Sequence, residues 1–241
     1  QDAWCAKKIF QQKPDRHYDL ASSVPAMGII SQFVPVTMID IRPPDISLPN
    51  LSFIKSDMRI LPFADHSIPS LSSICVLEHI GLGRYGDALD PFGSEKATRE
   101  IKRVLAPGGN LYISVPVDSH NKVYFNAHRA FTRDYVLKLF APLALIEERY
   151  IYGNRMEDAY TAKKGFGTGL YHFKKTLVAK TENAQHEESV LAPDFSSINR
   201  ECRYSRNARR ALVVYTDCRC TIARAANVSP RTHRGDAVVD D

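Results

Sequence analysis

Residues 61–116 read LPFADHSIPSLSSICVLEHIGLGRYGDALDPFGSEKATREIKRVLAPGGNLYISVP, and this stretch decides the fold. Two apolar runs, residues 71–77 and 110–117, flank a glycine-rich loop and the segment 94–105. In that segment apolar residues recur at helical spacing behind Ser94, which predicts an amphipathic helix with Ser94 as its N-cap. Buried strands joined by a helical crossover are parallel, so the stretch predicts one half of an open α/β sheet.

The rest of the first 180 residues extends this pattern of short apolar runs and helical segments. Further predicted strands cover residues 16–21, 36–41, 51–54, 143–152 and 170–179, and further predicted helices cover 25–33 and 132–140. We expect the last two strands to pair with each other along an edge, and Thr132 to cap the last helix. Alternating strands and helices predict a Rossmann-like, doubly wound, mostly parallel sheet.

Composition is that of an ordinary globular protein, with 44% hydrophobic and 24% charged residues among 241. The net charge is +5, but the basic residues are scattered, so we expect no nucleic-acid partner. No apolar stretch reaches the roughly 18 residues of a membrane span, and no signal-peptide pattern is present. Five irregularly spaced cysteines favour a reducing, cytoplasmic location. The first residue is Gln1 rather than Met, so the question whether a segment precedes it stays open. The sequence leaves the oligomeric state open as well.

A change of composition predicts a domain boundary near residue 180. The preceding residues carry thirteen Lys and ten Arg, whereas residues 181–241 carry nine Arg and no Lys, and their apolar residues keep no regular period. We therefore predict one domain over residues 1–180 and a C-terminal tail over 181–241 that is a candidate for disorder. Within the tail, the apolar run 211–215 favours an edge strand.

Candidate ligand-binding residues lie at or just after the carboxyl end of each of the first four predicted strands. In chain order these residues are Asp19 with Ala21, Ser22 and Ser23, then Asp40, then Asp57, then Glu78 with His79. In an open parallel sheet, ligands bind outside the carboxyl ends of the strands. A carboxylate that closes the second strand accepts hydrogen bonds from two ribose hydroxyls. The pattern therefore predicts a nucleoside-bearing cofactor across these four strand ends.

The same segments carry a family resemblance. The stretch LPFADHSIPSLSSICVLEHI, followed by REIKRVLAPGGNLYISVP, resembles the class I S-adenosylmethionine-dependent methyltransferases that act on small molecules. The flanking segments QDAWCAKKIF, IDIRP, EHIGLGRYGDALDP and FNAHRAFT resemble an uncharacterised methyltransferase-like family, classed as a domain of unknown function. The resemblance covers residues 1–180 and implies a seven-strand sheet with its last strand antiparallel, with S-adenosylmethionine as the cofactor.

The resemblance also implies roles for single residues. Asp19, Ala21, Ser22 and Ser23 would form the loop under the methionine part of the cofactor, and Asp40 would bind the ribose. Asp57 and Met58 would contact the adenine, while Leu77, Glu78 and His79 would line the methyl-transfer end. Ala21 departs from the family pattern, which has glycine there, and its additional methyl group narrows the space for the cofactor.

Transfer of a methyl group to a hydroxyl requires alignment of the acceptor and removal of a proton. His79 and His128 are the candidate bases, because imidazole titrates near neutral pH, and Glu78 is a candidate for orienting either one. Tyr85, Asp87 and Arg129 are the candidate substrate contacts. The predicted acceptor is a small or sugar-like molecule, methylated at oxygen.

Other interpretations stay open beside this one. Asp40 and Asp57 are also typical of residues that stabilise turns, and Glu78 and His79 could form a hydrogen-bonded structural pair. A catalytically degenerate member of the family would serve as a binding or scaffold module. A nicotinamide-dependent oxidoreductase would need Gly-x-Gly-x-x-Gly after the first strand, and the loop at 81–90 lacks the Lys-Ser/Thr of a phosphate loop. No metal is expected, because the spacing of Cys202, Cys218, Cys220 and His233 matches no usual zinc site.

Overall fold

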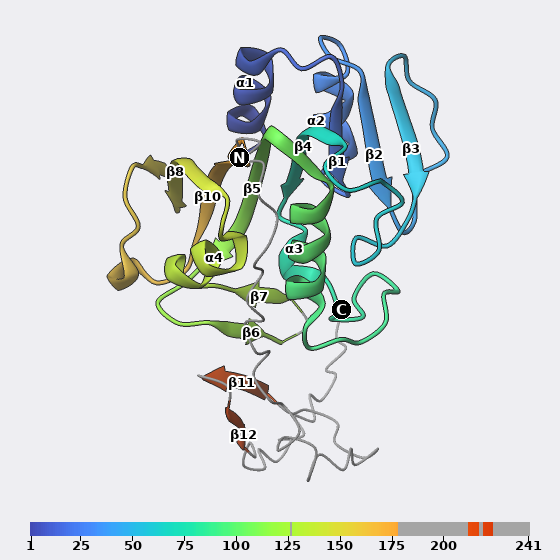
Figure 1. The fold of residues 1–241 in the computed structure, drawn as a ribbon. Coiled ribbons are helices and arrows are strands. Elements are labelled where there is room, and N and C mark those ends of the chain that lie inside the picture. The colour runs from blue at the N-terminus through green and yellow to red at the C-terminus, as the bar shows by residue number, and fades with distance from the viewer. Residues whose placement is uncertain (126, 178–211, 217–218, 224–241) are drawn as a thin grey trace, which may run out of the picture. The chain divides into compact units, whose positions relative to one another are not determined.

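A large mixed sheet forms the centre of residues 1–177 in the computed structural model (Figure 1). The structure describes residues 1–125 and 127–177, and the backbone of 212–216 and 219–223. The strands of this sheet are β1 (His17–Leu20), β2 (Val36–Asp40), β3 (Leu51–Lys55), β4 (Ile68–Ile74), β5 (Leu105–Val117), β8 (Ala144–Tyr152), β9 (Arg155–Glu157) and β10 (Gly167–Lys174).

The strand order is β3-β2-β1-β4-β5-β10-β8-β9. The pairs from β3 through β5 are all parallel, whereas β10 pairs antiparallel with both β5 and β8. This order confirms the predicted α/β fold with a mostly parallel sheet and an antiparallel last strand. The short β9 adds an eighth strand beyond the seven that we predicted.

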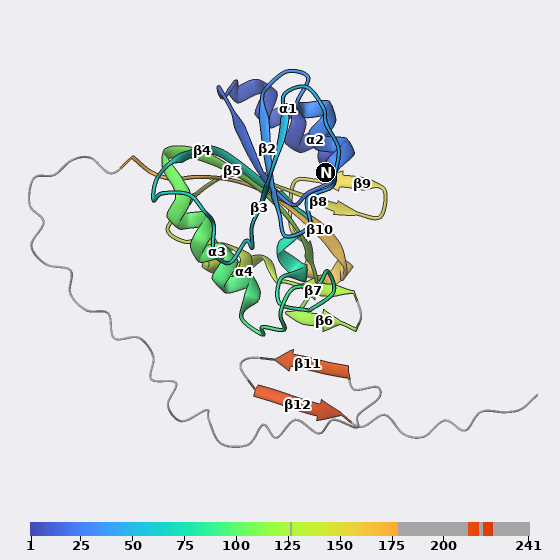
Figure 2. The same cartoon turned by 90° about the vertical axis from the view of Figure 1, so that its right-hand side faces the viewer.

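Helices cover both faces of the sheet (Figures 1 and 2). On one face lie α1 (Asp2–Gln12) and α2 (Val24–Ile30), and on the other lie α3 (Gly93–Val104) and α4 (Arg133–Phe140). Successive strand residues point to opposite faces, so Met38 packs in the core under α1 and α2 while Ile39 packs in the core under α3 and α4. Two separate apolar cores therefore hold the sheet from both sides.

The predicted strand 71–77 and the predicted helix 94–105 differ from the structure at their ends. Strand β4 ends at Ile74, because Cys75 takes a left-handed backbone with a φ of +54°, and Leu77 to His79 form a short 3₁₀ helix. Ser94 is not the N-cap of α3: its hydroxyl donates to the carbonyl of Leu77 at 2.8 Å. The prediction of Ser94 as a cap was therefore wrong, since tertiary contact competes for the same hydroxyl.

The predicted pairing of the last two strands is confirmed, but its position along an edge is wrong. Strand β10 enters between β5 and β8, so β10 is buried and the short β9 lies at the edge. Residues of β10 pair from Gly167 with Val117 to Lys174 with Asn110. Because this pairing spans the whole of β10, it fixes the loop before β10 beside the end of β5.

Two small antiparallel pairs accompany the large sheet. The pair β6 (Lys122–Tyr124) and β7 (His128–Ala130) follows β5, and Figure 1 shows it beyond the carboxyl ends of the parallel strands. In the C-terminal unit, β11 (Leu212–Thr216) pairs with β12 (Arg219–Ala223) in a sheet of its own. The rest of the predicted tail lies outside the described residues, so the boundary at 180 stays a prediction.

The helices are short, and local signals place them. Pro25 lies in the first turn of α2, and the hydroxyl of Thr132 accepts the backbone N–H of Tyr135, which confirms Thr132 as the N-cap of α4. Among the residues that the structure describes, no helix combines the length and the apolar character that crossing a membrane requires.

Removing the cap of α4 should destabilise the domain. We expect Thr132→Ala to lower the free energy of unfolding by about 1 kcal/mol, because the N–H of Tyr135 loses its acceptor. Urea denaturation followed by circular dichroism measures this change. Thr132→Ser keeps the hydroxyl and should recover most of the loss, and equal stability of all three proteins would contradict the capping role.

Candidate functional site

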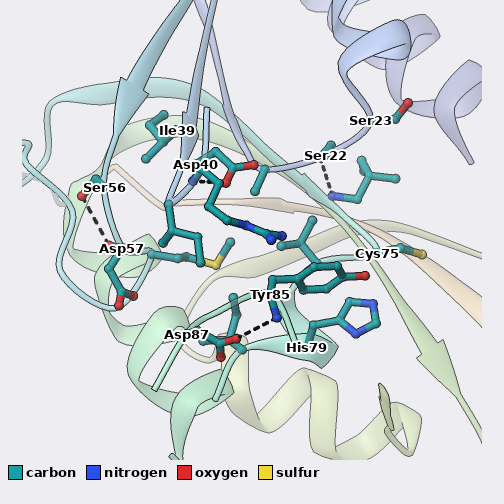
Figure 3. A pocket seen from close by; sticks show the side chains of 17 residues that line it. Ser22, Ser23, Ile39, Asp40, Ser56, Asp57, Cys75, His79, Tyr85 and Asp87 are labelled. Atoms are coloured by element: carbon teal, nitrogen blue, oxygen red, sulfur yellow. Dashed lines mark hydrogen bonds between the residues drawn. The ribbon is translucent and has the colours of Figure 1, made fainter. Parts of the chain in front are cut away.

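A cavity of about 400 Å³ opens where β1, β2 and β4 end (Figure 3). The predicted cofactor residues on its wall are Ala21, Ser22, Ser23, Asp40, Asp57 and Met58, and the predicted catalytic and substrate residues on its wall are His79, Tyr85 and Asp87. Figure 3 shows His79 and Tyr85 across the cavity from Asp40. The carboxyl ends of parallel strands meet at one edge, so residues predicted separately form one wall.

Asp19 lies beneath the cavity rather than on its wall, and it anchors the loop after β1. Its fully buried carboxylate accepts the N–H and hydroxyl of Ser22 at 2.9 and 2.7 Å and the hydroxyl of Ser72 at 2.5 Å. Ser72 also contacts the buried His17 ring at 2.9 Å. Burial raises the pKa of Asp19 to about 6, although the bonds from Ser72 and Ser22 oppose this rise. Asp19 therefore ties β1, β4 and the loop together.

Ala21 occupies a backbone conformation that glycine usually takes. Its φ is +56°, in the left-handed region, which costs an ordinary residue about 1–2 kcal/mol. The hydrogen bonds from Ser22 to Asp19 hold the loop in this shape. The departure from the family pattern at Ala21 therefore leaves the conformation of the loop intact and adds a methyl group to the cavity wall.

Asp40 and Asp57 both reach the cavity, but their surroundings differ. Oδ1 of Asp40 accepts the N–H of Arg42 at 2.7 Å, a turn that fixes the carboxylate at the end of β2. Asp57 forms an ion pair with Arg59 at 2.7 Å, and this hydrogen bonding lowers the pKa of Asp57. Asp57 is thus already engaged by a cation, whereas Asp40 keeps an oxygen for a ligand.

His79 is oriented by a backbone carbonyl. Its Nδ1 lies 3.0 Å from the oxygen of Ala127, and a carbonyl only accepts, so Nδ1 carries the hydrogen and Nε2 of the neutral ring carries the lone pair. Burial lowers the pKa of His79, which favours this neutral form. Oε1 of Glu78 lies 3.9 Å from Nε2, beyond hydrogen-bond distance, so Glu78 does not orient His79 in this arrangement.

Glu78 and Leu77 are buried behind the cavity wall. Burial raises the pKa of Glu78 to about 8, so its side chain is mostly protonated at neutral pH, and Oε2 has no hydrogen-bond partner in the described part of the chain. Leu77 packs in the core under α3 and α4. Both residues support the 3₁₀ helix that carries His79, and their predicted direct roles stay predictions.

His128 and Arg129 belong to β7 and do not line the cavity. The His128 ring lies edge-on to His79, with 6.1 Å between ring centroids. The guanidinium of Arg129 donates to the carbonyls of Ile80 and Asp90 at 2.6 and 3.3 Å, so it fastens the glycine-rich loop from outside. Arg129 therefore supports the glycine-rich loop. The predicted contact of Arg129 with substrate stays a prediction.

The pair β6–β7 is fixed by Asp118, a buried residue after β5. Its carboxylate accepts the hydroxyl of Tyr124 at 2.6 Å and pairs with Lys122 at 2.8 Å. Burial alone would raise the pKa of Asp118, but the bonds from Lys122, Tyr124 and Ser119 outweigh burial and lower that pKa to about 2. Asp118 therefore positions the elements that bear His128 and the carbonyl of Ala127.

Sequence reasoning missed several residues of the site. Arg42 and Cys75 line the cavity, and the guanidinium of Arg42 lies 5.4 Å from the ring centroid of Tyr85. Arg42 follows Asp40 by two residues, a spacing that could have drawn attention to it. Cys75 was expected inside a strand, but its left-handed backbone lies just after β4 on the cavity wall, with Sγ 3.1 Å from the hydroxyl of Ser114.

The described residues hold no cluster of three or more His, Cys, Asp or Glu side chains arranged for a metal ion. Of the cysteines and histidine considered for zinc, Cys202, Cys218 and His233 lie outside the described residues. For Cys220 the structure gives the backbone alone, as part of β12. The prediction that these residues form no zinc site therefore stays a prediction.

One family model matches part of the chain, and it carries no described activity. Residues 63–180 match the model of the family described as Caenorhabditis protein of unknown function, DUF268. No curated protein matches the sequence.

Solved structures place the fold among methyltransferases. The [4+2]-cyclase SpnF is 13% identical with a TM-score of 0.56, over 73% of this chain and 82% of that chain. The Burkholderia thailandensis 1,6-didemethyltoxoflavin-N1-methyltransferase, solved with 1,6-didemethyltoxoflavin and S-adenosylhomocysteine, is 14% identical with a TM-score of 0.53, over 73% and 78%. The N-methyltransferase NodS from Bradyrhizobium japonicum WM9, in complex with S-adenosylhomocysteine, is 12% identical with a TM-score of 0.50, over 72% and 85%. The resemblance inferred from the sequence is confirmed at the level of the fold.

The low pKa of Asp118 predicts acid sensitivity. Because its folded pKa of about 2 lies below the unfolded value of about 3.9, its stabilisation is present above about pH 4 and is lost as the pH falls to about 2. We expect Asp118→Asn to lower the free energy of unfolding at neutral pH by about 2 kcal/mol and to flatten its pH dependence in that window. Urea denaturation at several pH values measures both effects.

The matched control for this experiment is Asp15→Asn, at an exposed carboxylate between α1 and β1. This variant should follow the wild-type curve. A wild-type pH dependence in Asp118→Asn would contradict the assignment.

Proposed function

We propose that this chain, which has the class I methyltransferase fold, binds S-adenosylmethionine in the cavity at the ends of β1, β2 and β4. The observation that carries the proposal is the state of Asp40 at the end of β2. Its Oδ1 is held by the N–H of Arg42, and its Oδ2 receives no hydrogen bond from the residues that the structure describes. A fixed carboxylate with one open oxygen suits the hydroxyls of a ribose.

The remaining walls of the cavity fit this cofactor. A volume of about 400 Å³ falls within the range of about 300–1,000 Å³ typical of small-molecule sites. The loop at Ala21 already has the left-handed backbone that a glycine would give, and Asp19 holds it in place. Met58 and Ile39 offer apolar surface beside Asp57 for a flat base. These features support binding of a nucleoside-bearing molecule with its methionine part near Ala21 and Ser22.

The reaction we propose is methyl transfer to the oxygen of a small molecule. When bound, S-adenosylmethionine supplies a methyl group on a sulfonium, whose C–S bond breaks as the new C–O bond forms. His79 accepts the proton of the acceptor hydroxyl at Nε2, the nitrogen left without hydrogen by the bond from Nδ1 to Ala127. In this proposal Tyr85 and Asp87, on the same wall of the cavity, hold the acceptor against His79.

A second candidate is a binding module that keeps the fold without the reaction. The same fold occurs in a protein described as a [4+2]-cyclase, and a fold by itself does not fix an activity. The methyl group that Ala21 adds to the cavity wall favours this alternative. Measuring cofactor binding shows whether such a module binds the cofactor at all. Measuring turnover and its pH profile distinguishes the module from an enzyme.

Calorimetry with S-adenosylhomocysteine tests the cofactor site. We expect wild-type protein to bind it and Asp40→Ala to bind roughly 10- to 100-fold more weakly, because a charge-assisted hydrogen bond is lost. Asp45→Ala, at an exposed carboxylate in the next loop, should bind like wild type. Absence of binding by the wild-type protein, or binding by Asp40→Ala as tight as that of wild type, would refute the proposal.

Turnover of a methyl acceptor, detected by mass spectrometry, tests the base. We expect kcat/KM to fall as the pH drops through the pKa of His79, with a midpoint below about 6.5 because burial lowers that pKa. His79→Gln should lose roughly 10²- to 10⁴-fold in kcat and lack this limb of the profile. His120→Gln, at an exposed histidine after β5, is the matched control. An unchanged profile in His79→Gln would exclude His79 as the base.

A further inference from the structure

Five aromatic side chains form a continuous row that starts at the cavity and leads away from it. We call this row the aromatic platform, and it consists of Tyr85, His79, His128, Tyr124 and Phe166. Ring centroids are 5.2 Å apart between Tyr85 and His79, 6.1 Å between His79 and His128, and 5.6 Å between His128 and Phe166. Tyr85 and His79 line the cavity, so the platform begins where the methyl group would be transferred.

Three segments that are distant in the sequence supply these rings. Tyr85 and His79 come from the segment after β4, Tyr124 and His128 from β6 and β7, and Phe166 from the residue before β10. Asp118 holds the hydroxyl of Tyr124, and the pairing of β10 with β5 fixes the position of Phe166. The platform is therefore held by the framework of the fold and does not depend on one loop.

Parts of the platform are open to ligand. The side chain of Phe166 is 50% exposed and that of Tyr85 is 39% exposed. Between them, Nε2 of His128 is buried and has no hydrogen-bond partner within the described residues. A buried polar atom without a partner costs about 1–3 kcal/mol, so a ligand hydroxyl that pairs with it would be favoured.

Three of the charged groups near the platform already have partners. Lys122, over the ring of Tyr124, pairs with Asp118, and Arg84, beside Tyr85, donates to the carbonyl of Ala127. The carboxylate of Asp87 accepts the backbone N–H of Gly81 at 2.6 Å. The exposed ring of Phe166 and the imidazole nitrogens therefore remain for a ligand, beside the Arg42 guanidinium, which lies 5.4 Å from the ring centroid of Tyr85.

We propose that the platform binds the methyl acceptor by the flat face of a hydroxylated ring, with one hydroxyl at Nε2 of His79 and another near Nε2 of His128. This inference rests on the proposed function and names its substrate class. Phenols and pyranose sugars share the required chemistry, an apolar ring face with adjacent hydroxyls. An acyclic alcohol lacks the face and would not be held.

Nuclear magnetic resonance titration tests the platform with defined probes. The probes are catechol and methyl β-glucopyranoside, with 1,2-propanediol as the acyclic control, each added with and without saturating S-adenosylhomocysteine. We expect saturable binding of at least one ring compound and none of the diol, and the ring compound that binds identifies the source as phenol or sugar. Phe166→Leu should raise its Kd roughly three- to tenfold through loss of the ring contact.

Two further variants keep the test specific. Phe125→Leu changes a 68% exposed aromatic residue next to Tyr124 and should bind the probe like wild type. His128→Phe keeps a ring but removes Nε2, and it should raise the Kd roughly three- to tenfold.

The two proposals fail in different ways. Binding of S-adenosylhomocysteine without any ring compound, or equal Kd values in Phe166→Leu and Phe125→Leu, would overturn the platform and leave the cofactor site standing. Binding of a ring compound, weakened by Phe166→Leu, in a protein that does not bind S-adenosylhomocysteine would overturn the proposed function and support the platform.

Discussion

The hydrogen bonds to the buried carboxylate of Asp19 are the constraint on which the cofactor side of this protein depends. Asp19 receives bonds from Ser22 in the loop after β1 and from Ser72 in β4, so one side chain joins two strands and a loop. The left-handed backbone of Ala21 costs free energy, and these bonds compensate for it. Without them the loop would lose the shape that opens the cavity beside Asp40.

The acceptor side depends on a different kind of contact. There the side chain of His79 is held by the carbonyl of Ala127, which lies in the turn between β6 and β7. That pair of strands is held in turn by the buried carboxylate of Asp118. The two halves of the site are thus each stabilised by one buried acid, and both acids lie at the carboxyl end of a strand of the large sheet.

Much of the fold and half of the site could be predicted from the sequence. Apolar runs and their spacing are local properties, so the seven longer strands of the large sheet, its main helices and its mostly parallel order were predicted, whereas the short β6, β7 and β9 were not. Asp40 and Ser22 were found because parallel strands bring their carboxyl ends to one edge. The end of β4 was misplaced because the left-handed backbone at Cys75 is not signalled by composition, and Ser94 was misassigned because a carbonyl from another element takes its hydroxyl.

The sequence by itself determined the α/β sheet, its strand-end acids and the resemblance to methyltransferases, since each of these is written in contiguous residues. The tertiary structure alone decided that β10 lies between β5 and β8, that Ala127 rather than Glu78 orients His79, and that Phe166 joins His128. These arrangements join residues tens of positions apart through packing and backbone hydrogen bonds. No local pattern encodes such contacts, because they arise only when the sheet brings the separate segments together.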